Sequence, residues 1–253
     1  MTSRSLAVLL AVLLFSFSSA RAHADPLSDL RASLQKLAGE QPVKAQIVVK
    51  NTVKNHDEDQ AQQRVEEGTV VAEDGPQGLR LSWAPQQIHE ARKAEWQKAA
   101  NPDAPVQHGS SLSVLGAKDA ADLLDYAEPL RLLLEGAALV DNKVEPRNGK
   151  AGRLLVLRPR DGLTASDKKS LKDREDVLKV WLDETGLPVT LDRSVKLKFS
   201  KFFISFAVTV HEARTFTRLG DRLLVTQWNE ESSGAGMGQG GESRKVIRVT
   251  PMP

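Results

Sequence analysis

Alternation of apolar and polar residues over the second half of the chain most constrains its fold. Between residues 153 and 250, apolar side chains recur with the period of a strand that has one buried and one solvated face. Six segments show this pattern: Arg153–Arg158, 177–183, 188–199, 202–214, 219–228 and 244–250. Residues typical of tight turns separate some of them, in Glu184-Thr185-Gly186-Leu187 and Gly220-Asp221. The pattern predicts an antiparallel sheet.

The first half of the chain mixes helix and strand patterns. Helices are expected over residues 25–38, Pro85–Ala100 and 117–138, and strands over 44–54, 64–73 and 79–83. Pro129 predicts a kink in the third helix. A glycine-rich segment, 232–242, is expected to be a mobile loop. We therefore expect one α+β domain over residues 25–253, a long antiparallel meander with helices between its two parts.

Residues 1–24 have the pattern of a secretory signal peptide. Arg4 gives a positive start, residues 6–17 are apolar, and Ala22-His23-Ala24 fits a signal-peptidase site. The apolar run is shorter than a membrane-spanning helix. Asp25 follows where a bacterial lipoprotein would have cysteine, so we expect a periplasmic, unlipidated mature chain without a transmembrane span.

Composition excludes several classes of protein. Removing Arg4 and Arg21 with the signal takes the formal net charge from +2 to zero, which argues against a nucleic-acid partner. Hydrophobic residues make up 40% of the 253 residues, enough to build a core and too many for a disordered chain. The chain has no cysteine, so the fold relies on its core rather than on disulfides.

No recognisable set of residues for catalysis is present in the sequence. The histidines of the mature chain are isolated from one another: His56, His89, His108 and His211. The chain has neither a Gly-x-Ser-x-Gly elbow nor a phosphate-binding loop. His56-Asp57-Glu58-Asp59 has oxygen ligands for a cation, but a solvated acidic loop is the favoured interpretation. We expect a protein that is not an enzyme, with no catalytic residue, metal or cofactor.

Aromatic and basic residues in the later strands allow more than one interpretation. Trp181 falls on the strand face opposite Leu178 and Val180. The apolar run at 202–206 predicts burial on both faces of a central strand. A basic band over Arg193, Lys196, Lys198 and Lys201 is favoured as an edge or surface strand protected by charge, with an anionic partner as the alternative.

Two short motifs resemble the superfamily of periplasmic lipoprotein carriers, the relatives of outer-membrane lipoprotein-sorting proteins. They are the strand end Leu79-Arg80-Leu81-Ser82-Trp83-Ala84-Pro85 and the hairpin Val180-Trp181-Leu182-Asp183-Glu184-Thr185-Gly186-Leu187-Pro188. The resemblance implies a curved antiparallel sheet, an unclosed half-barrel, covered by helices on its concave side. It also implies an acyl chain in that apolar groove, whereas other relatives sense envelope stress.

The expected function is to bind a lipid, an acyl chain or a lipoprotein in an apolar groove between sheet and helices. The alternative is an envelope protein–protein interaction or stress-sensing module with the same fold. Helical spacing predicts that Leu123 and Leu134 face the sheet, and that Leu132 contacts another element or a ligand. The expected groove residues are Leu79, Leu81, Trp83, Leu123, Leu130, Leu132, Leu134, Leu178, Val180 and Phe206.

The signal-like pattern of residues 1–24 predicts the mass of the mature protein. We expect cleavage between Ala24 and Asp25 and no added acyl group, because no cysteine is available for lipidation. Intact mass spectrometry of the protein from the producing cell measures both properties. A retained signal or an acyl-sized mass increment contradicts this prediction.

Overall fold

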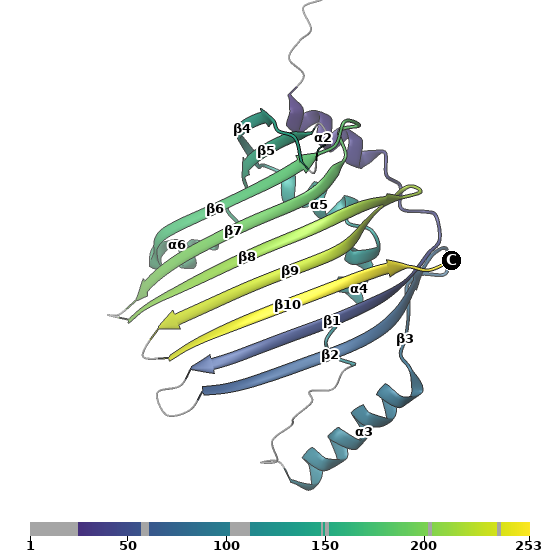
Figure 1. Ribbon diagram of the computed structural model, residues 1–253. Coiled ribbons are helices and arrows are strands. Elements are labelled where there is room, and N and C mark those ends of the chain that lie inside the picture. Colours follow the sequence, from purple (N-terminus) through teal and green to yellow (C-terminus); the bar gives the residue numbers. More distant parts are fainter. Residues whose placement is uncertain are drawn as a thin grey trace, which may run out of the picture.

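The computed structural model describes residues 25–56, 61–101, 112–147, 149, 152–201, 204–236 and 239–253. Ten strands form one open antiparallel sheet in the order β3-β2-β1-β10-β9-β8-β7-β6-β5-β4 (Figure 1). The strands are β1 (Val43–His56), β2 (Ala61–Asp74), β3 (Arg80–Ser82), β4 (Ala138–Val144), β5 (Arg153–Arg158), β6 (Leu171–Leu182), β7 (Pro188–Lys201), β8 (Ile204–Leu219), β9 (Arg222–Gly236) and β10 (Gln239–Pro251). The helices of the described residues are α2 (Pro26–Gln35), α3 (Pro85–Ala100), α4 (Ala117–Leu124), α5 (Ala127–Leu134) and α6 (Ala165–Ser170).

The first and last strands of the chain pair with each other. β1 runs antiparallel to β10 from the pair Ala45 and Pro251 to the pair His56 and Gly240. On its other side β1 pairs with β2 along its whole length. The N-terminal strands and the C-terminal meander therefore form one sheet.

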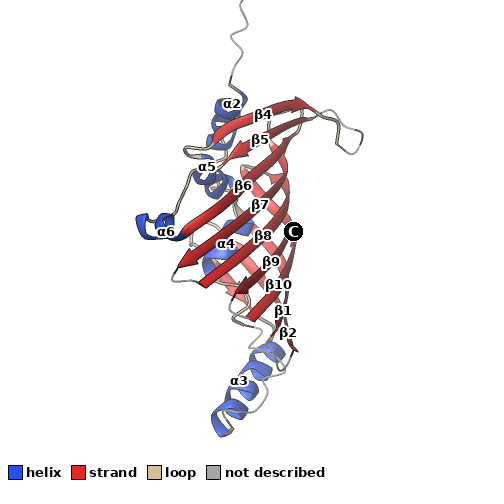
Figure 2. Ribbon diagram, turned by 90° about the vertical axis from the view of Figure 1, so that its left-hand side faces the viewer, coloured by secondary structure: helices blue, strands red, loops and turns tan. Residues whose placement is uncertain are grey.

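One face of the sheet, called here the helix side, carries α2, α4, α5 and α6, and α6 lies against the β6 and β7 end of that face (Figure 2). Alternate strand residues on this side are buried, as in Ala45, Ile47 and Val49 of β1. They join one core with helix side chains such as Leu30 and Leu124. α3, in contrast, projects beyond the sheet (Figure 1), and Ala91 is its one buried residue.

Helix α2 is fixed at both its start and its packed face. The Asp25 carboxylate accepts hydrogen bonds from the backbone N of Leu27 (3.2 Å) and from Ser28 Oγ (2.9 Å), and so caps the helix. Arg31 Nη2 donates to the carbonyl oxygen of Leu134 at 2.5 Å. Because that carbonyl lies at the end of α5, one side chain joins the two helices.

The predicted turn at Gly220-Asp221 is confirmed, and it also holds the segment before β1. Gly220 adopts φ +62°, which favours glycine in a tight hairpin. The Asp221 carboxylate accepts from the backbone N of Glu40 (3.0 Å) and of Gln41 (3.2 Å). The buried Arg222 then donates to Asp74 Oδ2 at 2.7 Å and to the Gln41 carbonyl at 2.6 Å.

The single helix predicted over 117–138 is wrong. The chain forms α4 and α5, separated at Asp125 and Tyr126, and β4 begins at Ala138. Asp125 Oδ1 accepts from the backbone N of Ala127 (3.1 Å), while Tyr126 donates its backbone N–H to the Leu223 carbonyl (2.8 Å). Pro129 lies in the first turn of α5, where its missing N–H has no intrahelical partner to lose. It therefore causes no kink.

Two further expectations need correction. The glycine-rich segment 232–242 is paired strand, not loop, over its described part: β9 continues to Gly236 and β10 begins at Gln239. β8 is an inner strand, but burial on both faces fails at Phe206, which is 44% exposed. Residues 202 and 203 of that run lie outside the described residues.

The α5 helix allows a stability test. Leu134 is completely buried in the core, whereas Leu132 on the same helix is 53% exposed. Leu134→Ala should lower the free energy of unfolding by about 2–5 kcal/mol because it leaves a cavity. The control Leu132→Ala should change it by about 0.5 kcal/mol or less. Urea unfolding of both variants measures the difference, and equal losses would contradict this placement of the helix.

Candidate functional site

The helix side of the sheet extends past α4 and α5 along β7 and β8 (Figure 1). Six apolar side chains line this extension, called here the open strip: Val195, Leu197, Phe199, Phe206, Val208 and Val210. They face one another in register as three cross-strand pairs. The rings of Phe199 and Phe206 stack with centroids 4.9 Å apart. Phe206 is exposed and the other five are half-buried, so the strip is apolar surface in contact with solvent.

On its β9 side the open strip is bordered by small residues, whose side chains are too short to cover it. Ser232, Gly234 and Gly236 pair with Val210, Val208 and Phe206. A Cβ added at Gly236 would lie 2.7 Å from the Phe206 Cβ, so that position admits glycine alone. A Cβ at Gly234 would have no atom nearer than 3.8 Å. Glycine at 234 is therefore not required by packing, and it leaves space beside Val208.

A charged belt separates the open strip from the closed core. In register across the sheet it consists of Arg193, Glu212, Glu230 and Lys245. All four belong to the helix side, and the exposed fraction of the Arg193 side chain is 28%. Arg193 lies beside Glu212, and Lys245 lies beside Glu230. These neighbours of opposite charge lower the free-energy cost of placing charges between two apolar regions.

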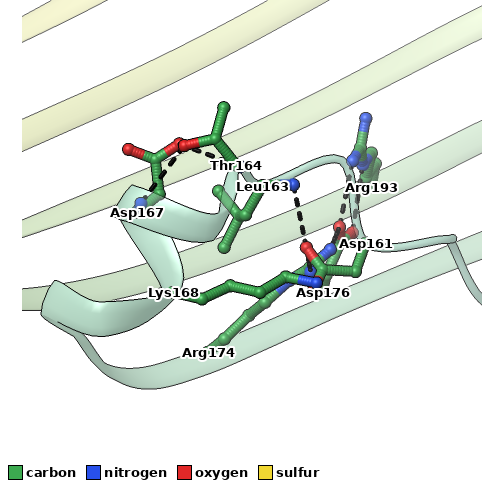
Figure 3. Close-up of polar contacts among 8 residues, drawn as sticks. All are labelled: Asp161, Leu163, Thr164, Asp167, Lys168, Arg174, Asp176 and Arg193. Atoms are coloured by element: carbon green, nitrogen blue, oxygen red, sulfur yellow. Dashed lines mark hydrogen bonds and ion pairs between the residues drawn. The ribbon is translucent and has the colours of Figure 1, made fainter.

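At the β6 end of the belt, a buried carboxylate is held by two arginines (Figure 3). Asp176, with 3% of its side chain exposed, accepts from Arg193 Nε at 3.1 Å and from Arg193 Nη2 at 3.0 Å. Arg174 Nη2 donates to the same carboxylate at 2.9 Å. The two-pronged geometry matches the fork of a guanidinium, so Arg193 is fixed in orientation at the edge of the strip.

The segment that leads into α6 is attached to this cluster through Asp161 (Figure 3). Its carboxylate accepts from the backbone N of Leu163 at 2.9 Å and pairs with Lys168 (3.0 Å) and Arg174 (2.7 Å). The Leu163 hydrogen bond, followed by these cations, lowers the pKa of Asp161 below its ordinary value. Arg174 thus links the α6 segment to the buried Asp176.

A cavity of about 470 Å³ lies between α4, α5 and the strands, next to the belt. The strands contribute Arg193, Glu212, Arg214 and Trp228, and the helices contribute Lys118, Asp119, Asp122, Leu123, Tyr126, Pro129, Leu132 and Leu133. It is called here the α4 cavity. Arg193 and Glu212 form the cross-strand pair next to Val195 and Val210 on the same face of the sheet. The cavity therefore adjoins the open strip.

Arg214 is the most enclosed charge of the α4 cavity. Its guanidinium carbon lies 4.6 Å from the centre of the Tyr126 ring and 4.3 Å from that of Trp228. The side chain is 10% exposed and forms an ion pair with Glu212. Burial lowers the pKa of the Arg214 guanidinium. The two rings and the carboxylate together stabilise a charge that burial alone would disfavour.

The opposite face of the sheet carries a separate, polar hollow of about 620 Å³. His211, Glu231 and Arg244 lie side by side in it on successive strands. Arg244 Nε is 3.4 Å from Glu231 Oε1, and His211 Nδ1 is 3.3 Å from the Arg193 carbonyl. The row is therefore a set of solvated cross-strand contacts.

The predicted groove residues divide into three groups. Five are part of the closed core: Leu123, Leu130, Leu134, Leu178 and Val180. Leu79, Leu81 and Trp83 pack against that core and are partly buried. Leu132 and Phe206 are exposed, Leu132 at the α4 cavity and Phe206 in the open strip. The structure thus places most of the predicted set in filled core rather than around an open space.

Sequence reasoning missed most of the open strip. Val195, Leu197, Val208 and Val210 alternate with polar residues along β7 and β8, which is a visible signal of an apolar face. The pattern does not show where along a strand the covering helices end.

Lys196 and Lys198 of the predicted basic band are exposed, as a surface strand requires, but β7 is an inner strand and not an edge. They lie across from β6 carboxylates, Lys196 at 2.8 Å from Glu175 and Lys198 at 3.7 Å from Asp173. Arg193 lies on the other face of β7, and the side chain of Lys201 lies outside the described residues.

Residues predicted to be isolated or outward-facing were also located. Trp181 is half-buried on the face away from Leu178, under the guanidinium of Arg147 at 4.1 Å. His89 is exposed on α3. The side chain of His56, residues 57–59 of the acidic loop, His108 and the signal segment 1–24 lie outside the described residues.

Within the described residues, no three His, Asp or Glu side chains are grouped so that they could hold a metal ion. In the same part of the chain, no helix is long and apolar enough to cross a membrane. No protein-family model matches this chain, and no curated protein shows significant sequence similarity to it. The resemblance drawn from the two short motifs therefore stays a prediction.

The buried carboxylate of β6 provides a matched pair of variants. Asp176→Ala should lower the free energy of unfolding by about 1–3 kcal/mol because it removes the carboxylate that pairs with the partly buried Arg193 and leaves Arg174 with Asp161 alone. Glu175→Ala removes an exposed carboxylate from the same strand and should have little effect. Chemical denaturation measures both. Equal effects would mean that the Asp176 cluster adds nothing beyond a surface ion pair.

Proposed function

We propose that this protein is a non-enzymatic periplasmic carrier that binds the acyl chain of a lipid or lipoprotein on the open strip. The observation that supports the proposal is the open strip itself, six apolar side chains that stay half-buried or exposed although α6 packs beside them on β7. An inner-strand surface of this kind is disfavoured in contact with water, and contiguous exposed apolar surface is typical of binding sites.

In this proposal the sheet is a curved, unclosed half-barrel, and the helix side is its concave side. α2, α4 and α5 fill one part of the concavity, and the acyl chain occupies the part beyond the charged belt. The closed core then has a structural role, and the predicted groove residues buried in it, such as Leu178 and Leu130, support the site without contacting ligand.

The length of the open strip is compatible with useful affinity. Val195 and Phe199 lie four residues apart on β7, which corresponds to about 14 Å of strand. Burial of eight methylene groups there would contribute about 6 kcal/mol. That energy corresponds to a Kd on the order of tens of micromolar, suited to reversible loading and release.

The proposed location follows from the signal-like residues 1–24, with cleavage after Ala24. An exported carrier meets both membranes of a bacterial envelope, where acylated molecules need shielding from water. Nucleic acid is not a partner in this proposal, because the mature chain has no net positive charge.

An envelope interaction module is the second candidate function, supported by helix α3. This helix projects from the sheet, and Trp96 on it is 75% exposed. A lone exposed aromatic residue is common on protein surfaces, whereas six in-register apolar residues are not. The open strip is therefore stronger support for the carrier than Trp96 is for the interaction module. Native mass spectrometry of protein from its own periplasm separates the two: bound lipid supports the carrier, and a stoichiometric protein complex without lipid supports the module.

Two variants test the open strip directly. Val208→Asp places a charge in the strip, and Gly234→Val fills the space beside Val208 without removing any apolar group. Each should weaken the binding of a fluorophore-labelled long-chain fatty acid at least about tenfold, a loss of about 1.4 kcal/mol. Fluorescence titration gives the affinities.

Val246→Asp is the matched control, because Val246 is a half-buried valine of β10 on the opposite face of the sheet. It should leave fatty-acid affinity unchanged. Thermal unfolding of all three variants confirms that each is folded at the titration temperature. Unchanged affinity in the folded Val208 and Gly234 variants would contradict binding on the open strip.

A further inference from the structure

Two buried donors in the α4 cavity have no hydrogen-bond acceptor among the described residues. They are Arg214 Nε and Trp228 Nε1. The nearby Glu212 Oε1, which forms an ion pair with Arg214 Nη1, is a buried acceptor without a hydrogen bond and does not reach either of these two N–H groups. Both side chains line the cavity, and the two residues are directly opposite each other in the pairing of β8 with β9. Buried N–H groups are almost always paired in folded proteins, so two unpaired donors at one place require an explanation.

Neither donor can easily turn to reach solvent. The Arg214 side chain is nine-tenths buried between the rings of Tyr126 and Trp228, and its Nη1 is occupied by Glu212. Trp228 is covered on one face by Arg214, and Lys245 Nζ lies 4.7 Å from its ring centre. Packing therefore restrains both side chains, which lowers the entropy cost of binding an acceptor that reaches their N–H groups.

The charges of the cavity wall balance. Its cations are Lys118, Arg193 and Arg214, and its carboxylates are Asp119, Asp122 and Glu212. A full negative charge entering this cavity would meet as many carboxylates as cations. An uncharged oxygen acceptor meets no such repulsion and still satisfies both donors.

We propose that the α4 cavity binds the carbonyl oxygen of an acyl ester or amide through Arg214 Nε and Trp228 Nε1. The inference rests on the proposed function, since the attached acyl chain extends from the cavity onto the adjoining open strip. The preferred ligand class is then an O- or N-acylated molecule rather than a free fatty acid or a hydrocarbon. Leu132 lines the same cavity and is 53% exposed, so the cavity meets solvent beside this side chain.

The experiment compares three probes of equal chain length: a long-chain fatty acid methyl ester, the free fatty acid and the alkane. Each displaces a fluorescent acyl probe from the full mature protein. The wild type should bind the methyl ester about fivefold to tenfold more tightly than the alkane, since one or two hydrogen bonds are gained. It should bind the free acid no more tightly than the ester.

Trp228→Phe removes the indole N–H and keeps an aromatic ring beside Arg214. It should abolish the preference for ester over alkane, leave alkane affinity unchanged, and leave the Tm unchanged or higher because an unpaired buried donor is gone. Trp181→Phe, on the opposite face of the sheet, is the control and should retain the preference.

The outcomes separate the two proposals. Ester and alkane of equal affinity in the wild type would overturn the carbonyl site while leaving acyl binding on the open strip intact. A free acid that binds more tightly than the ester would show that the donors serve an anion, and would also overturn it. No binding of any probe would contradict the proposed function itself.

Discussion

Antiparallel pairing of β1 with β10 is the constraint on which the rest of the structure depends. It joins strands from the two ends of the described chain over twelve residue pairs, from Ala45 with Pro251 to His56 with Gly240. Such a contact has a large loop-closure cost, which the buried row of Ile47, Val49 and Ile247 helps to offset. Without it the N-terminal strands and the C-terminal meander would each expose an unpaired edge and half a core. The hydrogen bonds of Asp221 with the segment before β1, and of Arg222 with Asp74, lie at the same junction.

The helix side of this one sheet is divided into a closed core, a charged belt and an open strip. The division arises because the strands are longer than the helices that cover them: β8 has 16 residues, whereas α4 and α5 have eight each. A strand longer than its cover exposes the rest of its apolar face. The belt charges lie where the cover ends, and buried Asp176 fixes Arg193 there. Serine and glycine on β9 keep the strip accessible on one side.

Much of the fold could be predicted from local sequence, and little of the candidate site could. Strand alternation, the glycine turns and helix Pro85–Ala100 are local signals, and the structure has all of them. The break before α5 was missed because it depends on Leu223, a residue distant in sequence that accepts the Tyr126 N–H. For the site, periodicity identified apolar faces correctly but could not separate covered from uncovered lengths of one face. Leu178 and Phe206 therefore looked equivalent, although one is fully buried and the other is 44% exposed.

The sequence by itself determined an antiparallel sheet with amphipathic helices, and a chain without cysteine, metal-binding motif or net charge after its first segment. These properties depend on residue type and short-range spacing, which folding does not alter. Tertiary structure alone decided that the first strand meets the last, that Asp176 meets Arg193, and that Arg214 and Trp228 lie side by side with unpaired donors. Each of these contacts joins residues that are neighbours only across strands. The physical reason is that register and helix length, rather than composition, decide which part of an apolar face is left open.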